Sequence, residues 1–573
     1  MHGYAALADA LVREGVKDVF TLAGSDVIEL LQDLRDNKKV RVVSARHEAA
    51  AATMADAYAR VTGGVGVCTA TLGPGITNAA TALVSAARNR SPLIFITSEV
   101  PRTITGTGTR CGAAEPDPKT GYWVPKWGFG LGQFAEATGV TCMNVRSKET
   151  LAEDTQAVFQ HVRSGKGPVV FAILRSIMEE ELGGEWHYTP SAARKPDRVR
   201  PDSEAIARAA GILRAAEKPV ILAGRGAFES QAGEEIRDLA RRTGALLANT
   251  TLAMGFFADH PNSIGIAGHL AYEPAQRLLR ESDCLVAVGC SLSAHTTGFG
   301  ILFPRAKTIR IDLDPARTAK VAPPSVGITG DARVTLAALN KQLDGQVTRE
   351  KRGWNGDAAS LAAAARAAHT TSHNAIPGTI DPGQLVMEID RITPKERIVA
   401  VDGGIYMFYP VAEVRVPSPD RFVWSANDFA SIGLGLFQGI GAALGRPDQH
   451  VIVIVGDGGL MASIQELDTA VRYRIPMTVF VFNDGAFGSM VHLLEDKKGK
   501  NGDVVRFDNP EFADVARAFG AVGMTVRSKE DLQAVSRMMG KGDRPLLVDA
   551  KIDPTVVHET WKQAVAQRLG QQV

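Results

Sequence analysis

Two carboxylates that each follow an apolar run are the residues of this sequence best suited to chemistry. The run VIVIV leads into GDGG at residues 456–459, and the next run, MTVFVF, leads into ND at residues 483–484. Since the carboxyl ends of parallel strands meet at one edge of a sheet, Asp457 and Asp484 are expected to lie close together. Glycines let backbone N–H groups approach a phosphate, and a divalent cation takes carboxylate and phosphate oxygens together. The pattern therefore predicts a site for a metal-bound phosphate.

The same residues also fit a purely structural interpretation. GDGG can form a tight turn, and ND can form an Asx turn, without binding any ligand. A helix predicted from about Ala462 would direct the positive end of its dipole toward the glycines, which favours an anion without requiring one. Both interpretations stay open at this point, because a GDG sequence by itself is weak evidence.

A third carboxylate stands near the other end of the chain. In SARHEAAAATMADAYAR, residues 44–60, Glu48 follows a predicted strand and begins a helix that is otherwise small and apolar. A carboxylate at a helix N-terminus often only compensates the helix dipole. The alternative is a role in proton transfer, for which a carboxylate must be held in a fixed position.

Strand-like and helical segments alternate along the chain and would position these residues. Apolar runs predict four strands in each of three units: VKDVFTL, KVRVVSA, GVGVCTAT and PLIFITS; KPVILAG, ALLANT, DCLVAVG and AKTIRIDLD; RIVAVDGG, VIVIVGDGG, MTVFVFND and PLLVDAKID. Short apolar runs between amphipathic helices indicate parallel sheets with helices on both faces. Two stretches without apolar periodicity separate the units. The predicted fold class is α/β, with three doubly wound parallel-sheet domains at residues 1–183, 202–343 and 380–573.

Length and composition are those of a large globular protein. The chain has 573 residues, of which 45% are hydrophobic and 22% charged, and its formal net charge is +1. This balance favours neither nucleic acid nor an anionic membrane, and no apolar run reaches the roughly 18 residues of a membrane span. Five cysteines without a CxxC pair indicate neither a disulfide framework nor a zinc site. A cytoplasmic location is therefore expected.

Three motifs resemble those of thiamine-diphosphate-dependent enzymes, and they follow one another along the chain in the same order as in that family. GDG and ND at this separation resemble the family's metal-binding signature. RHEAAAA, residues 46–52, is similar to the glutamate-bearing motif, and TLGPGITNAATAL, residues 71–83, to its usual companion. The resemblance is closest to the group of acetolactate synthase, benzoylformate decarboxylase and benzaldehyde lyase. The central stretch from ILAGRGAFES to FFADHP, residues 221–261, is similar to acetolactate synthase in particular.

The resemblance implies a role for each domain and each motif. The first domain would bind the aminopyrimidine of thiamine diphosphate, the central domain would be structural or flavin-binding, and the third would bind the diphosphate. Asp457, Asp484 and the carbonyl of Ala486 would hold Mg²⁺, or Ca²⁺ or Mn²⁺. Many members have Asn where this chain has Asp484, so its extra charge is expected to tighten metal binding. The further cofactor-binding positions implied are Gly404, Ile405, Ser431, Ile432, Gly458, Gly459, Ala486, Phe487, Gly488 and Ser489.

The resemblance implies a specific role for one acidic residue, Glu48, and for one apolar residue, Ile432. Glu48 would be the catalytic residue, hydrogen-bonded to the pyrimidine N1′ so that the cofactor's thiazolium C2 can lose its proton. Ile432 would lie under the bent cofactor, although plain core packing is the alternative from its residue type alone.

The implied activity is decarboxylation of a 2-oxo acid with carboligation of the resulting enamine to a carbonyl acceptor. The alternatives are a non-ligating 2-oxo acid decarboxylase, a hydroxyketone or 2-hydroxyacyl lyase, and a catalytically silent cofactor-binding paralogue. An NAD- or flavin-dependent dehydrogenase is a further class, but GRGAFES, residues 224–230, matches its glycine fingerprint poorly. FAD in the central domain is possible without being expected.

The substrate pocket and the assembly are also expectations. Candidate pocket residues are Ser25, Thr71, Gln133 and His295; Ser25 could equally be a helix N-cap, and His295 a structural hydrogen-bonding residue. An aromatic loop at residues 108–132 could wall the pocket or pack on a partner subunit. Because Glu48 and the metal ligands belong to different domains, the resemblance implies a homodimer or homotetramer with active sites shared between subunits.

Overall fold

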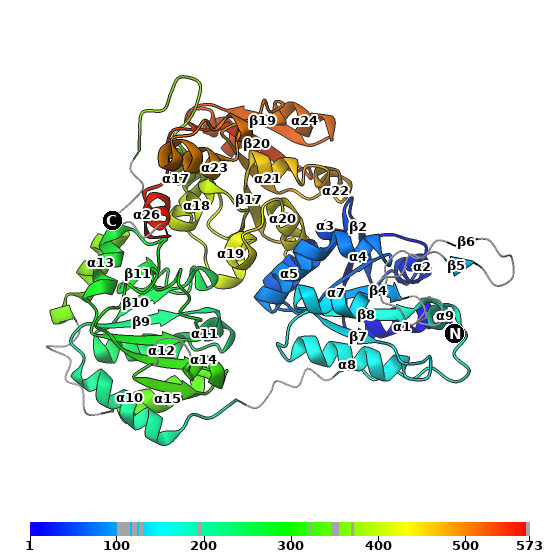
Figure 1. The fold of residues 1–573 in the computed structure, drawn as a ribbon, viewed down its shortest axis with the longest axis horizontal. Helices are drawn as coiled ribbons and strands as arrows, with labels where there is room; N and C mark the ends of the chain where they lie inside the picture. Colours follow the sequence, from blue (N-terminus) through cyan, green and yellow to red (C-terminus); the bar gives the residue numbers. More distant parts are fainter. Residues whose placement is uncertain are drawn as a thin grey trace.

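The computed structural model describes residues 1–99, 115–116, 123–124, 130–191, 198–319, 324–344, 354–367 and 372–568. This part of the chain contains three six-stranded sheets in which every pairing is parallel, and one two-stranded antiparallel pair, β5 (Glu115–Pro116) with β6 (Trp123–Val124). The predicted α/β class with three parallel-sheet domains is confirmed. Figure 1 shows the first domain in blue and cyan, the central domain in green and the third in yellow to red.

The first domain is built on a sheet in the order β2-β1-β3-β4-β8-β7. Its strands are β1 (Asp18–Leu22), β2 (Arg41–Ser44), β3 (Gly66–Ala70), β4 (Leu93–Glu99), β7 (Thr141–Asn144) and β8 (Val169–Leu174). Its helices are α1 (Gly3–Arg13), α2 (Ile28–Asp36), α3 (Glu48–Thr62), α4 (Pro74–Asn78), α5 (Ala80–Asn89), α7 (Leu131–Thr138), α8 (Leu151–Arg163) and α9 (Arg175–Glu179). Neighbouring residues alternate between two cores, with Phe20 in one and Val19 in the other, because both faces of the sheet are covered.

The central domain has the strand order β11-β10-β9-β12-β13-β14. Its strands are β9 (Pro219–Ala223), β10 (Leu246–Asn249), β11 (Ser263–Ile266), β12 (Cys284–Val288), β13 (Lys307–Asp312) and β14 (Val326–Thr329). Its helices are α10 (Ser203–Ala215), α11 (Arg225–Glu229), α12 (Gly233–Thr243), α13 (Glu273–Glu281), α14 (Pro315–Ala319), α15 (Ala332–Gln342) and α16 (Ala358–Arg366). Its sheet is also buried on both faces, since Ile221 and Val220 belong to different cores.

The third domain has the strand order β16-β15-β17-β18-β20-β19. Its strands are β15 (Arg397–Val401), β16 (Phe422–Trp424), β17 (His450–Gly456), β18 (Thr478–Asn483), β19 (Val522–Val526) and β20 (Leu546–Lys551). Its helices are α17 (Pro382–Ile392), α18 (Phe408–Glu413), α19 (Ala426–Phe429), α20 (Gly435–Gly445), α21 (Asp457–Met461), α22 (Glu466–Arg472), α23 (Gly488–His492), α24 (Phe512–Ala518), α25 (Leu532–Met538) and α26 (Glu559–Arg568).

The first and third sheets share one topology. Counted in chain order within each domain, their strands run second, first, third, fourth, sixth, fifth across the sheet. The order reverses between β1 and β3 in the first domain and between β15 and β17 in the third. Ligands of open parallel sheets bind beyond the carboxyl ends of the strands at such reversals. The topology therefore singles out the loops after β15 and β17.

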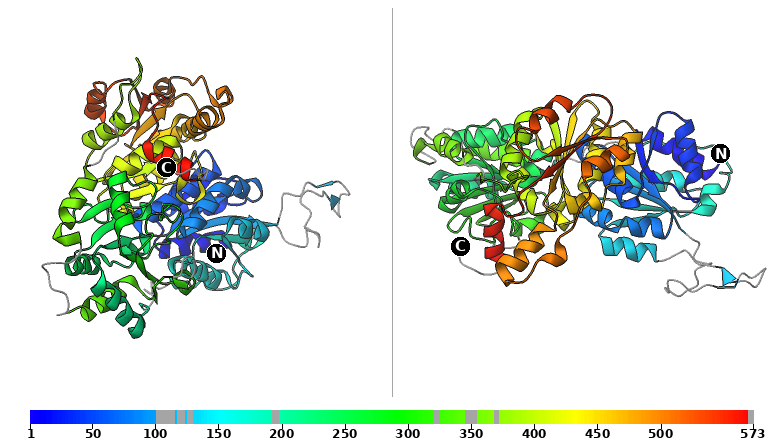
Figure 2. Two further views of the ribbon diagram at one scale, coloured as in Figure 1. Left: turned by 60° about the vertical axis from the view of Figure 1, so that its left-hand side comes forward. Right: turned by 90° about the horizontal axis from the view of Figure 1, so that it is seen from above.

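The third domain packs against both of the others (Figures 1 and 2). Helix α3 of the first domain lies against α20, where Gly441 approaches the backbone of Met54 so closely that a Cβ would overlap it. One hydrophobic core consequently includes residues of both sheets, such as Phe20 and Val453. On the other side, Met254 and Leu270 of the central domain join the core of the third.

The helices of the described ranges include none that combines the length and the apolar character needed to cross a bilayer.

Candidate active site

A cavity of about 1890 Å³ lies mainly between the third domain and the central domain, and Arg88, Arg90, Ser164 and Gly165 of the first domain also line it. Loops that follow β15, β17 and β18 form one wall, and residues after β9, β12 and β13 form much of the opposite wall. The predicted site residues that line it are Gly404, Ile405, Ile432, Asp457, Gly458, Gly459, Asp484, Ala486, Phe487, Gly488, Ser489 and His295. The fold thus brings together most of the positions predicted from the third domain.

Asp457 begins a helix directly at the end of β17. The helix predicted from about Ala462 starts earlier, since α21 runs from Asp457 to Met461 with Gly456 as its N-cap. The two glycines after Asp457 accept a helical conformation that places their backbone N–H groups in the first turn, where those groups lack partners within the helix. Asp457, Gly458 and Gly459 therefore reach the cavity from the first turn of a helix instead of from a loop.

Burial dominates the electrostatics of the two carboxylates. It raises the pKa of Asp457, and it raises the pKa of Asp484, to which repulsion from Asp457 adds. Asp457 Oδ1 accepts a hydrogen bond of 2.9 Å from the Gly458 N–H, and Asp484 Oδ1 accepts one of 3.2 Å from the Ala486 N–H. A divalent cation would offset both the burial and the repulsion. The residues present therefore fit a cation such as Mg²⁺.

The donor set for that cation is small. No cluster of three His, Cys, Asp or Glu side chains suitable for a metal occurs within the described ranges. The set predicted from sequence consists of two carboxylates and the backbone carbonyl of Ala486. The residue Ala486 is 5% exposed. Mg²⁺ commonly takes only one or two carboxylates from the protein and completes its shell with water and substrate phosphates. The donor set is therefore consistent with a metal that is shared with a diphosphate.

Glycines allow the loops to approach each other at this edge. A Cβ on Gly459 would overlap the carboxylate of Asp402, and one on Gly488 would overlap the carboxylate of Asp484. Gly404 has a φ of 144°, which side chains other than hydrogen rarely permit. These steric limits explain why glycines occur at the strand ends, and they keep backbone N–H groups accessible to a ligand.

Asp402 is a structural residue of the site that the sequence did not identify as such. It is 0% exposed, burial raises its pKa, and it accepts hydrogen bonds from Gly433 N–H at 2.7 Å and Ser425 Oγ at 2.8 Å. These bonds fix the loop that carries Ile432, which lines the cavity and is 44% exposed. The alternative prediction, that Ile432 packs in the hydrophobic core, is therefore wrong for the single chain. Ser431, one position earlier, is not among the described residues that line the cavity.

Glu48 lies in the first domain, outside the lining of this cavity. It is the first residue of α3, is 7% exposed, and accepts a hydrogen bond of 3.1 Å from Asn78 Nδ2. The loop before it is held to the third domain, because the Arg46 N–H donates to Glu466 Oε1 at 2.7 Å. Asn78 belongs to the TLGPGITNAATAL motif at residues 71–83, but the sequence pattern did not predict its contact with Glu48.

Two of the predicted pocket residues lie together at the carboxyl edge of the first sheet. Ser25 follows β1, and Thr71 follows β3 and donates a hydrogen bond to Asp26. The alternative role of Ser25 as an N-cap is wrong, because α2 begins at Ile28 with Val27 at the cap position. Gln133 is exposed in the first turn of α7. Neither Ser25, Thr71 nor Gln133 is among the described residues that line the cavity.

His295 is the pocket candidate that does line the cavity. Its backbone carbonyl accepts the N–H of His269 at 3.0 Å, and the two rings are 4.8 Å apart. Burial lowers the pKa of His269 to about 4. The backbone of His295 therefore holds His269 in place, while the residue itself lines the cavity. Most of the aromatic loop at 108–132 lies outside the described residues, so its role remains a prediction.

Asn509 was not predicted, although it contacts a predicted metal ligand. Its Nδ2 donates to Asp457 Oδ2 at 2.6 Å from a loop more than fifty residues further along the chain. The Asn-Pro pair at 509–510 indicates only a loop, so the sequence carried no signal for this contact.

Three family models match the chain in sequence order. The thiamine pyrophosphate enzyme N-terminal TPP binding domain matches residues 1–117, the central domain matches residues 206–339, and the C-terminal TPP binding domain matches residues 402–550.

Curated relatives match over nearly the whole chain. A probable acetolactate synthase large subunit from Methanococcus aeolicus is 29% identical over 97% of this chain and 92% of its own length. An acetolactate synthase from Mycobacterium bovis is 28% identical over 99% of this chain and 92% of its own. A probable 2-ketoarginine decarboxylase from Pseudomonas aeruginosa is 31% identical over 94% of this chain and 91% of its own.

Proposed function

Because the chain belongs to the thiamine pyrophosphate enzyme family, we propose that it decarboxylates a 2-oxo acid and joins the remaining fragment to a carbonyl acceptor. The observation that supports this most is the convergence of Asp457, Asp484 and the glycine loops on one cavity. The similarity to acetolactate synthases along almost the entire chain supports the carboligation step.

The third domain would hold the cofactor. Asp457, Asp484 and the Ala486 carbonyl would bind Mg²⁺, and the Gly459 N–H would donate to a diphosphate oxygen, while the Gly458 N–H holds Asp457 Oδ1. When bound, thiamine diphosphate supplies a carbon nucleophile that also accepts the electrons released when CO₂ leaves. The exposed face of Ile432 would support the cofactor in the conformation that brings its two rings together.

Glu48 would hold the proton that activates the cofactor. Its carboxylate would hydrogen-bond the pyrimidine N1′, while the Asn78 amide fixes the position of its second oxygen. A carboxylate that is 7% exposed and held by a neutral donor is well placed for such a proton transfer.

The complete site would need a second copy of the chain. Glu48 is not among the described residues that line the cavity, whereas the metal ligands are. We therefore propose a homodimer, or a homotetramer made of two such dimers, in which the first domain of one subunit faces the third domain of its partner.

A second candidate is simple decarboxylation without ligation. The similarity to a probable 2-ketoarginine decarboxylase supports it, and a hydroxyketone lyase would use the same site residues. FAD remains a separate alternative for the central part of the cavity, which reaches the carboxyl ends of β9, β12 and β13.

Substitution of Glu48 tests the proposal directly. In Glu48→Gln, release of CO₂ from 2-oxo acids and formation of hydroxyketones should both fall by at least about 100-fold, since a general acid–base group contributes 10²–10⁴-fold. The exposed Glu149→Gln, in the same domain, should keep wild-type turnover. Unchanged turnover in Glu48→Gln would contradict the assigned role.

A substrate panel distinguishes the candidates. Aliphatic and aromatic 2-oxo acids are incubated with thiamine diphosphate and Mg²⁺, with and without an aldehyde, and the products are identified by mass spectrometry. Carboligation predicts a hydroxyketone whose mass includes the acceptor, whereas simple decarboxylation predicts only the aldehyde derived from the donor.

A further inference from the structure

A segment far along the chain packs over the loop that carries the predicted metal ligands. Residues 503–509, here called the strap, run antiparallel to the loop after β18, with a bridge between Arg506 and Ala486. The Phe487 N–H donates to Val505 O at 2.9 Å, and the Phe507 N–H donates to Gly485 O at 2.7 Å. The strap therefore fixes the backbone around Ala486, whose carbonyl is a predicted ligand.

Asn509, the last residue of the strap, reaches the carboxylate of Asp457. Asn509 Nδ2 donates to Asp457 Oδ2 at 2.6 Å, while Oδ1 of the same carboxylate accepts the Gly458 N–H at 2.9 Å. Two donors on opposite oxygens leave the carboxylate little freedom to rotate. Asn509 thereby determines how Asp457 faces the cavity.

The orientation of the Asn509 amide is itself determined by a second amide. Asn509 Nδ2 is 3.3 Å from Asn483 Oδ1, which also accepts the Gly485 N–H at 3.3 Å. Asn483 Nδ2 in turn donates to Asp549 Oδ1 at 2.9 Å. A carboxylate can only accept, so Asn483 must direct its NH₂ toward Asp549 and its oxygen toward Asn509.

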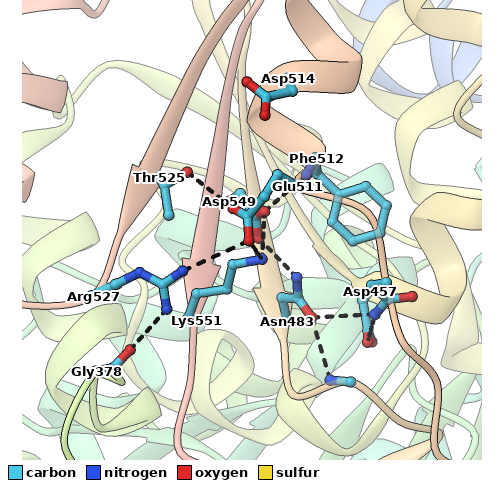
Figure 3. A network of polar contacts seen from close by, with 12 residues as sticks. Gly378, Asp457, Asn483, Glu511, Phe512, Asp514, Thr525, Arg527, Asp549 and Lys551 are labelled. Carbon is cyan, nitrogen blue, oxygen red and sulfur yellow. Dashed lines mark hydrogen bonds and ion pairs between the residues drawn. The ribbon is translucent and has the colours of Figure 1, made fainter.

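A buried ion pair anchors this series of contacts (Figure 3). The Asp549 side chain is 0% exposed, its Oδ2 accepts the Phe512 N–H at 3.0 Å, and Lys551 Nζ lies 2.8 Å away. Lys551 also contacts Glu511 at 3.3 Å, beside the strap. Asp549 therefore sets the direction of the Asn483 amide and, through it, that of the Asn509 amide.

We propose that Asn509 is a positioning residue for the cation site, which aims the free lone pairs of Asp457 at the metal through the series Asp549, Asn483 and Asn509. This inference rests on the proposed function, because it assumes that Asp457 binds the cation. Residues that orient metal ligands typically change metal affinity by 10–100-fold when they are replaced.

Binding of Mn²⁺ in the presence of thiamine diphosphate tests the inference without any measurement of turnover. Free Mn²⁺ is quantified by electron paramagnetic resonance for the full-length wild type, Asn509→Ala and Asn509→Leu. Both variants should raise the Kd for Mn²⁺ by about 10- to 100-fold. Asn501→Ala is the matched control, because Asn501 lies just before the strap and its amide bonds the exposed Asp503. Its Kd should equal that of the wild type.

Thermal unfolding without metal separates positioning from a general structural role. Asn509 is only partly buried, so the metal-free variants should unfold within a few degrees of the wild-type temperature, the small decrease reflecting the lost hydrogen bond to Asp457. Wild-type Mn²⁺ affinity in either Asn509 variant would overturn the inference, as would a loss of affinity accompanied by a large drop in the unfolding temperature. If the wild type itself binds no Mn²⁺ with thiamine diphosphate, the proposed function fails instead.

Discussion

At the scale of single residues, the site is governed by two buried negative charges. Asp457 and Asp484 come from neighbouring strand ends, and each raises the free energy of the other in the ionised state. A bound cation would attract both carboxylates and so offset this repulsion, which makes the pair unfavourable without metal. The second carboxylate should therefore have opposite effects on the stability of the metal-free protein and on its affinity for the metal.

Replacing Asp484 by Asn separates these two effects. Without metal, in the presence of a chelator, Asp484→Asn should be more stable than the wild type by about 1 kcal/mol, because one of two nearby buried charges is removed. Its Kd for Mg²⁺ should rise by about 10-fold or more, since one charged ligand becomes neutral. Thermal unfolding and Mg²⁺ titration measure the two quantities. Asp448→Asn, an exposed position in the same domain, should change neither.

At the scale of elements, the packing of α3 on α20 fixes where Glu48 begins its helix. Glycine is needed at the crossing because the backbones of the two helices nearly touch at Gly441 and Met54. The N-terminus of α3 is held in addition by the hydrogen bond from the Arg46 N–H to the fully buried Glu466. The first and third domains of one chain therefore form a continuous unit with a shared core.

Substitution at this crossing should destabilise the protein. Gly441→Ala places a methyl group on the Met54 backbone, which cannot move without separating the helices, and should cost about 1–3 kcal/mol of stability. Gly211→Ala is the matched control, because Gly211 is an exposed glycine within α10 that has open space beside it. It should stabilise the protein by up to about 1 kcal/mol through helix propensity. Thermal unfolding of both variants checks the contrast, and equal midpoints would contradict the role of the crossing.

At the scale of the whole molecule, catalysis should depend on two chains. Glu48 does not line the cavity that the predicted metal ligands line, and large apolar side chains such as Phe429, Met461 and Met490 are at least 40% exposed on the third domain. Such exposure of apolar side chains, of which Met490 lines the cavity, is consistent with a surface that another subunit covers.

Mixed subunits provide the test. Glu48→Gln and Asp457→Ala chains carrying different tags are expressed together, and the doubly tagged dimer is isolated. If active sites are shared between subunits, one site of the mixed dimer contains both substitutions and the other contains neither. Activity should therefore be about half that of the wild type. Each variant alone should be inactive, which serves as the internal control. An inactive mixed dimer would show that each chain carries its own complete site.

The strands that could be predicted are mostly those buried on both sides. Runs such as VIVIV are continuous and apolar because helices cover both faces of the sheet. Within the three parallel sheets, the missed strands are β8 and the edge strands β7, β11, β14, β16 and β19. Most of these edge strands are short and partly exposed; β19, for example, has four of its five residues only partly buried, whereas β16 is buried but only three residues long. Their pairing partners, which lie elsewhere in the chain, define them more than their own residues do.

The sequence by itself determined the fold class and the residue types of the candidate site. Apolar runs that end in GDGG and ND predict parallel strands with carboxylates at their ends, because burial and charge are properties of residue type and local order. Only the tertiary structure decided that α21 begins at Asp457, that Ile432 is exposed, and that Asn509 holds Asp457. These features depend on contacts between residues far apart in the chain, and the spacing of residues along a sequence does not encode such contacts.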